Sequence, residues 1–207
     1  HFIRKHILRK LSMTEWARFR DLRPKNVDSN LYNYHLKQLI HENYIEHIVD
    51  KGYRLSPLGL RFLDHVTLET FEPRWQPKVL TMIIAIHDGK ILLWPKYKQP
   101  FINNWSLPSG KVHYEDATVA SAAMRELKYF TSELDTQLEH RGVVEFTVRV
   151  GGDAVSHTLG HLFGAKLRPK DISNERTEWY RLDKISSLEM SPATKEIISD
   201  YLRHDTF

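Results

Sequence analysis

The sequence predicts two domains: a small helical domain that ends in a β-hairpin, followed by a larger α+β domain. Its 207 residues are enough for two hydrophobic cores. Apolar residues recur at helical spacing over the first 43 residues, whereas from residue 79 they form the short runs typical of strands. Residues 67–77 contain two prolines and no clean period, so they suit a linker or an extended packing arm. We therefore expect domains at 1–66 and 78–207.

Four helices and a hairpin are expected in the first domain. Apolar spacing and capping residues predict helices over residues 2–11, from Ser12 or Thr14 to Leu22, from Asp28 or Ser29 to about residue 43, and from Ser56-Pro57 to Val66. The second is expected to carry Trp16 and Phe19, and the third to bury Tyr32, Leu36, Leu39 and Ile40. Residues 44–49 and 53–55 flank Asp50-Lys51-Gly52, a turn whose glycine accepts a positive φ, which predicts the hairpin.

This order of elements, with the stretch SNLYNYHLKQLIHENYIEHIVDKGYRLSPLGLRFL, resembles the winged-helix domains of bacterial and archaeal regulators. Residues 1–66 hold 12 Lys and Arg against 7 Asp and Glu, whereas the remainder holds 18 against 19. Such a surplus fits a protein that binds phosphate backbones, and also a plain solvated face. The resemblance implies that the third helix and the wing contact duplex DNA through Ser29, Asn30, Asn33, Tyr34, Lys37, Lys51 and Arg54.

The second domain contains strand-like segments and two helical ones. Strands are expected at 79–86, 91–94, 142–150 and 156–166, with helices at 118–131 and 192–202. Asp88-Gly89 is a turn signal between the first two strands, so these form a hairpin. The pattern predicts an α+β fold.

One segment of this domain, WSLPSGKVHYEDATVASAAMREL over residues 105–127, resembles the Nudix family in its Leu-Pro entry and its Arg-Glu-Leu helix. The resemblance spans about residues 78–204 and implies an α/β/α sandwich. In Nudix hydrolases the helix continues as Arg-Glu-hydrophobic-x-Glu-Glu-x-Gly, and its carboxylates bind Mg²⁺ on a diphosphate. Here Tyr129 and Phe130 stand at the two further glutamate positions and Ser132 at the glycine, so Glu126 is the helix acid that remains.

Two interpretations of this segment stay open. Arg125 and Glu126 form an ion pair that holds the loop, or Glu126 keeps a residual metal site with Glu115 or Asp116 as the loop acid. We expect no resident metal or cofactor, and Mg²⁺ only if the chain is a hydrolase. The acids that follow the helix are taken as solvated charges: Glu133, Asp135 and Glu139.

Two further sets of side chains invite a functional interpretation. Nudix-like domains bind nucleoside diphosphate compounds, and this resemblance makes ligand contacts of Lys96, Lys98, Trp105 and Lys111, although each alone also fits a surface lysine or a core tryptophan. His157 and His161 share one face of a predicted strand but lack an identifiable third ligand, so zinc binding is not expected.

Together these features favour a DNA-binding transcriptional regulator whose degenerate Nudix-like domain senses a nucleotide-type metabolite. It is similar to Nudix-related transcriptional regulators, in which the domain order is usually reversed. The alternatives are a Mg²⁺-dependent Nudix pyrophosphohydrolase with an accessory winged helix, and a protein-interaction scaffold. Expected partners are double-stranded DNA and a nucleotide-like small molecule, with a homodimer left open. The lack of cysteine, of a signal-peptide core and of any apolar run of about 18 residues predicts a cytoplasmic protein without a membrane partner.

Overall fold

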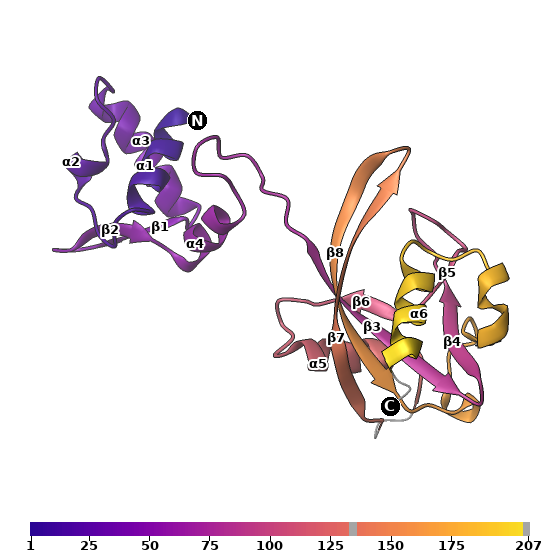
Figure 1. Cartoon of the computed structure of the whole chain (residues 1–207). Helices are drawn as coiled ribbons and strands as arrows, with labels where there is room; N and C mark the ends of the chain where they lie inside the picture. Colours follow the sequence, from indigo (N-terminus) through magenta and orange to yellow (C-terminus); the bar gives the residue numbers. More distant parts are fainter. Residues whose placement is uncertain (133–135, 205–207) are drawn as a thin grey trace. The chain divides into compact units, whose positions relative to one another are not determined.

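The structure is a computed structural model that describes residues 1–132 and 136–204. The chain forms two compact units, His1–Trp75 and Gln76–Phe207 (Figure 1). Each unit has its own hydrophobic core. Among the helices within the described ranges, none has the length and apolar character needed to cross a membrane.

The first unit contains four helices and one hairpin. Its elements are α1 (Phe2–Leu11), α2 (Phe19–Leu22), α3 (Ser29–His41), the antiparallel strands β1 (Ile45–Ile48) and β2 (Gly52–Leu55), and α4 (Pro57–Asp64). The Asp28 carboxylate caps α3 by accepting hydrogen bonds from the backbone N–H groups of Asn30 and Leu31, at 2.8 and 3.1 Å. The Ser56 hydroxyl caps α4 in the same way. The core lies between α1 and α3 and buries Ile3, Ile7, Tyr32, Leu36 and Leu39.

Three local predictions for this unit are wrong. Trp16 lies outside α2, because Ala17 pairs with Tyr53 of β2 through two backbone hydrogen bonds of 2.9 and 3.0 Å, and this extended backbone cannot belong to a helix. Ile40 is exposed at the end of α3 instead of facing the core. The last helix ends at Asp64, before Val66, which forms a bridge with Pro73.

Residues 67–75 pack back onto the first unit. The Arg9 guanidinium donates hydrogen bonds to the backbone carbonyls of Leu68 and Glu69, both at 2.8 Å. The Phe71 ring packs against the core of this unit, and the cationic groups of Lys5 and Arg9 lie within 6 Å of its centre. Of the two expectations for this segment, these contacts favour a packing arm over a free linker.

The second unit is built around a mixed sheet. Its elements are β3 (Lys78–His87), β4 (Lys90–Pro95), β5 (Trp105–Ser106), β6 (Ser109–Lys111), α5 (Val119–Leu127), β7 (Leu138–Val150), β8 (Asp153–Ala165), the 3₁₀ helices η1 (Pro169–Asp171) and η2 (Leu182–Ser187), β9 (Glu178–Arg181) and α6 (Thr194–His204). The strand order is β5-β4-β3-β8-β7, with β6 paired to β3 and β9 to β4. The pair β3–β8 is parallel and the other pairs are antiparallel.

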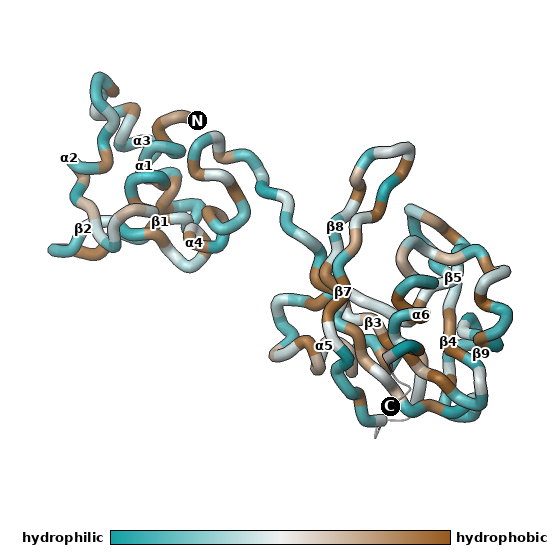
Figure 2. Tube along the Cα trace, in the orientation of Figure 1, coloured by the Kyte–Doolittle hydropathy of each residue, from teal (hydrophilic) through white to brown (hydrophobic). Residues whose placement is uncertain are grey.

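Two helices cover opposite faces of this sheet. Alternate residues of β3 point to opposite sides, so Met82 and Ile84 pack with Ile198 of α6, whereas Ile83 packs with Leu127 of α5. The strands β3 and β4 are hydrophobic over most of their length, since both of their faces are covered (Figure 2). This arrangement is the α/β/α sandwich that the sequence predicts.

The helix α5 is shorter than the predicted span 118–131. Thr118 caps its start by accepting a hydrogen bond from the Ser121 N–H, and the α-helix ends at Leu127. Thr131 forms a bridge with Ile172, which requires an extended backbone where the sequence predicts helix. The helix therefore stops before the two aromatic residues Tyr129 and Phe130.

Candidate functional site

Arg125 organises the segment that resembles the Nudix family. This residue is on the last turn of α5, and its guanidinium binds the Asp116 carboxylate through two hydrogen bonds of 3.0 and 2.8 Å. It also donates to the backbone carbonyl of Lys111 at 2.9 Å and pairs with the neighbouring Glu126 carboxylate. The loop before α5 is thus fastened to the helix by one cation, which is the arrangement of the ion-pair interpretation.

Both carboxylates of this cluster are largely occupied by these contacts. Hydrogen bonds from Arg125, and then from the backbone N–H of His113, lower the pKa of Asp116 to about 2. The Glu126 side chain is 13% exposed and fills the space where a side chain at Gly110 would be, so a larger residue at 110 would displace the Glu126 carboxylate. Both acids are thus engaged by Arg125.

The two aromatic residues after α5 have different surroundings. Phe130 is 2% exposed and packs edge-on against Trp94, with 5.2 Å between the ring centres. Tyr129 is 65% exposed. Phe130 is therefore part of the core, whereas Tyr129 is a surface aromatic.

Other acids do not complete a metal site among the described residues. No group of three or more His, Asp or Glu side chains within 1–132 and 136–204 is arranged to hold a metal ion. Glu115 is exposed on the loop. Glu139 pairs with Arg141 at 2.8 Å, so it is not a purely solvated charge. Glu133 and Asp135 lie outside the described residues.

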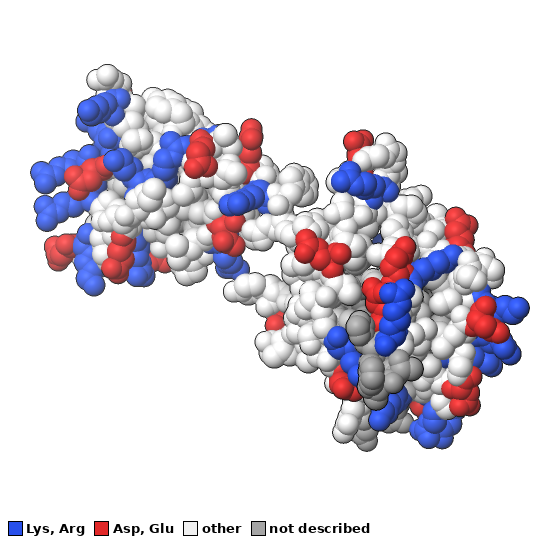
Figure 3. All heavy atoms as spheres, in the orientation of Figure 1, with Lys and Arg blue, Asp and Glu red and all other residues white. Residues whose placement is uncertain are grey.

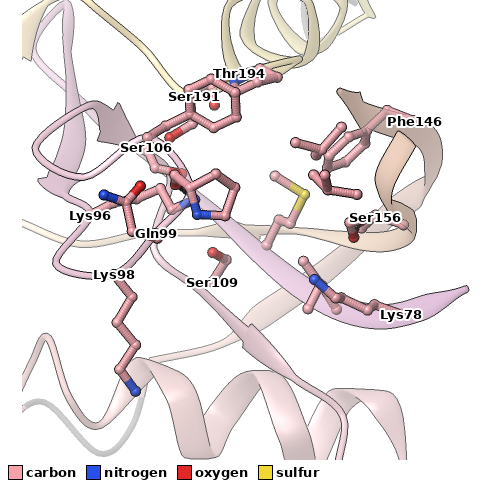
Figure 4. Close-up of a pocket in the computed structure, with 18 of the residues that line it drawn as sticks. Lys78, Lys96, Lys98, Gln99, Ser106, Ser109, Phe146, Ser156, Ser191 and Thr194 are labelled. Carbon is pink, nitrogen blue, oxygen red and sulfur yellow. Dashed lines mark hydrogen bonds between the residues drawn. The ribbon is translucent and has the colours of Figure 1, made fainter. Parts of the chain in front are cut away.

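A cavity of about 580 Å³ opens beside this segment, on the sheet (Figure 4). Its walls are mainly apolar and aromatic, and its polar side chains are lysines, hydroxyls and one amide. The residues that contribute most to this character are Met82, Trp94, Phe101, Phe146, Ser106, Ser109, Ser156, Ser191, Thr194 and Gln99. Its volume is in the range of small-molecule sites.

The charges in the cavity wall have one sign. Lys78, Lys96, Lys98 and Lys111 line it, and no Asp or Glu from the described part of the chain does. Burial, and then the charge of Lys78, lower the pKa of Lys96. The Lys96 ammonium donates a hydrogen bond to the Pro100 carbonyl at 2.7 Å and lies 5.8 Å from the centre of the Phe101 ring. Figure 4 shows the Lys98 side chain running away from the other labelled residues. This wall suits an anionic ligand.

The two histidines noted on β8 have separate partners. His157 contacts the Glu145 carboxylate at 2.6 Å, and His161 contacts His140 at 3.1 Å. Burial, and then the charge of His140, lower the pKa of His161. These pairs are ordinary contacts across the antiparallel strands β7 and β8.

In the first unit, α3 presents a polar face to solvent. Of the five residues expected to contact DNA from this helix, four are exposed and Asn33 is half-buried; the exposed ones are Ser29, Asn30, Tyr34 and Lys37. On the hairpin, Lys51 is exposed, whereas Arg54 pairs with Glu46 at 2.8 Å. The charged groups of both lie over the Trp16 ring, at 5.5 and 5.1 Å.

Basic side chains gather around this region. Figure 3 shows Lys and Arg over α2 and the tip of the β1–β2 hairpin. The exposed members of this basic surface are Arg18, Arg20, Arg23, Lys25 and Lys51. The surface extends beyond the residues that the sequence pattern singled out.

Comparison with protein families decides the family of the second unit. The NUDIX domain family matches residues 76–201, which is more than half of the chain. The chain belongs to the Nudix family. No curated protein sequence matches it.

Solved structures share the fold of this Nudix domain at low sequence identity. NrtR from Shewanella oneidensis complexed with a 27mer DNA matches with a TM-score of 0.50 and 20% identity, over 59% of this chain and 58% of that one. The Nudix domain of the same protein, complexed with ADP ribose, matches with a TM-score of 0.51 and 17% identity, over 71% of this chain and 98% of that one. The E. coli dihydroneopterin triphosphate pyrophosphohydrolase matches with a TM-score of 0.50 and 18% identity, over 63% of this chain and 99% of that one. The chain thus spans less than two thirds of the NrtR chain in its DNA complex.

The Nudix pattern locates part of this cavity. Three of the four expected ligand contacts line it: Lys96, Lys98 and Lys111. The fourth, Trp105, packs against Tyr180 in the core, and the tryptophan in the cavity wall is Trp94 of β4. The pattern missed the contributions of β7, β8 and the start of α6, which lie far from the Nudix segment in the sequence. Ser191-Pro192 before a helical period was the one available signal at that end.

Proposed function

We propose that this chain is a DNA-binding regulator whose Nudix domain binds a nucleotide-type ligand without hydrolysing it. The observation that carries the proposal is the ion pairing of Arg125 with both Asp116 and Glu126, next to a cavity lined by lysines. In a Mg²⁺-dependent hydrolase, carboxylates have to remain free to hold the metal on the diphosphate. Here they hold the loop instead.

The cavity supports an anionic ligand that is bound without a metal ion. Lysine ammonium groups are point charges that neutralise phosphates directly, and the apolar walls suit a base or another planar group. The Nudix domain of NrtR is complexed with ADP ribose in one solved structure. We propose a ligand of the same chemical class for this cavity.

The first unit supports the DNA-binding part of the proposal. Its element order, helix–helix–helix–hairpin–helix, is the order of a winged helix, with α3 as the recognition helix and β1–β2 as the wing. The exposed polar face of α3 and the basic surface over α2 and the hairpin lie on this unit. NrtR, which shares the fold of the other unit, is complexed with a 27mer DNA.

A binding-site selection tests the proposal. The full chain is incubated with random duplexes of about 27 base pairs, and the enriched duplex is then titrated by fluorescence anisotropy with and without ADP-ribose in EDTA. We expect an enriched sequence and a change in Kd of at least about fivefold with the ligand, a typical coupling between two sites. Lys37→Ala serves as the control, since it should lose DNA affinity and retain the ligand. Absence of any salt-dependent DNA binding would overturn the proposal.

A further inference from the structure

We propose that the anionic group of the ligand binds at the N-terminal end of α6, where the Ser191 hydroxyl donates a hydrogen bond to it, and not beside the Nudix helix. This inference rests on the ligand-binding part of the proposed function and is independent of DNA binding. The ligand then lies in the opposite orientation to the one that the Nudix segment alone suggests, in which its anionic group is beside the Nudix helix.

Ser191 is a buried hydroxyl in the cavity wall that lacks a partner. The residue is 8% exposed, and its Oγ has no hydrogen bond to any part of the chain that the structure describes. Its backbone is fixed: the N–H donates to the Trp105 carbonyl at 2.9 Å, and its own carbonyl accepts from the Thr194 N–H at 3.2 Å. Unpaired buried hydroxyls are rare because they are costly, and Ser191 is among the residues that line the cavity.

The helix that follows points its N-terminus at the same place. α6 has 11 residues, and its first residue, Thr194, is 1% exposed and lines the cavity. Apart from the Thr194 N–H, which bonds to the Ser191 carbonyl, the first N–H groups of such a helix have no acceptor within it, and they favour anions. The acid in the first turn, Glu196, is not part of the cavity wall. Figure 4 shows Ser191 and Thr194 together at one side of the cavity, opposite Ser109 and Lys78.

The other side of the cavity has cations but, among the described residues, no buried hydroxyl that lacks a partner. Lys78 and Lys111 line the wall there, whereas Arg125 beside the Nudix helix is already bound to two carboxylates and a carbonyl. Apart from Lys78, the wall contributed by β3 and β7 is apolar, with Met82, Phe146 and Val148. An anionic group at α6 would leave the planar, apolar part of the ligand against this wall. The ligand class is therefore an organic phosphate with an aromatic group, such as a nucleoside mono- or diphosphate.

Calorimetric titration of the full chain in EDTA tests the inference, with ADP and uncharged adenosine as probes. Ser191→Ala should weaken the binding of ADP by about tenfold, as expected for loss of a hydrogen bond to a charged group. The Kd for adenosine should change by less than about twofold. Ser187→Ala is the matched control, because its exposed hydroxyl bonds to the Lys184 carbonyl at 2.7 Å outside the cavity, and it should behave as wild type.

Amide chemical shifts of the wild-type chain give a second readout that needs no variant to fold. Adding ADP in EDTA should shift the amides of Ser191 and Thr194 more than those of Arg125 and Glu126. The inference is overturned if the larger chemical-shift changes occur at the Nudix helix, or if Ser191→Ala loses affinity for ADP and adenosine equally. It is also overturned if the chain does not bind ADP at all. The DNA selection and a hydrolysis assay judge the proposed function separately, so the two failures are distinguishable.

Discussion

Truncating Tyr129 and Phe130, the two aromatic residues that follow α5, should have very different effects on stability. Phe130→Ala removes a ring that is 2% exposed and packed on Trp94, so it should cost about 3–5 kcal/mol, of which the aromatic pair supplies about 0.5–1.5 kcal/mol. Tyr129→Ala removes a ring that is 65% exposed, and should cost less than about 0.5 kcal/mol. The backbone contacts of both residues, to Ser173 and Asn174, survive the truncation.

Urea unfolding of the full chain measures this difference, with hydrogen exchange of β3 as a probe specific to the Nudix unit. With a slope of about 1–3 kcal/mol per molar urea, the midpoint for Phe130→Ala should fall by at least about 1 M, while that for Tyr129→Ala should stay within the error. Equal midpoints of the two variants would refute the reasoning that residue 130 has become a core position.

The remaining predictions concern DNA and pH. Lys37→Ala should weaken binding to all duplexes alike, whereas Asn33→Ala should relax the preference at one base pair by about 1–3 kcal/mol. Titration of mutated duplexes checks this, and wild-type affinity of both variants would contradict it. Lys51→Ala should lower the slope of log K against log salt by about 0.9, and an unchanged slope would mean that the wing does not touch phosphates. Because Arg125 lowers the pKa of Asp116 to about 2, this pair stabilises the fold above about pH 4, and the contribution is lost as pH falls toward 2. The stability difference between wild type and an Asp116→Asn variant should therefore vanish over that range, and a difference that persists at pH 2 would contradict the pairing.

The sequence predicted those features that local patterns encode. The cap Asp28, one of two candidates for the third helix, the cap Ser56, the hairpin turn and the apolar run of β3 follow from spacing and side-chain chemistry within a few residues. The end of α5 was missed because it depends on a bridge between Thr131 and Ile172, forty-one residues apart. Tertiary pairing overrode the helical period there.

The candidate site was predicted only around the Nudix segment. The lysines near it follow from the resemblance, but the hydroxyl of Ser191 enters the cavity wall because Met190 pairs with Trp105 of β5, a contact that no local pattern shows. In the same way, Trp94 and Trp105 both lie in strands, and the sheet places only Trp94 in the cavity wall.

A hydrolysis assay tests the central claim most directly. Purified full chain is incubated with ADP-ribose in Mg²⁺ or in EDTA, and the release of AMP is followed beside a Glu126→Gln variant. The account predicts no release above background for either protein in either condition, because the ion pairs of Arg125 occupy the acids that a metal needs. Mg²⁺-dependent release by the wild type that the Glu126→Gln variant loses would contradict it.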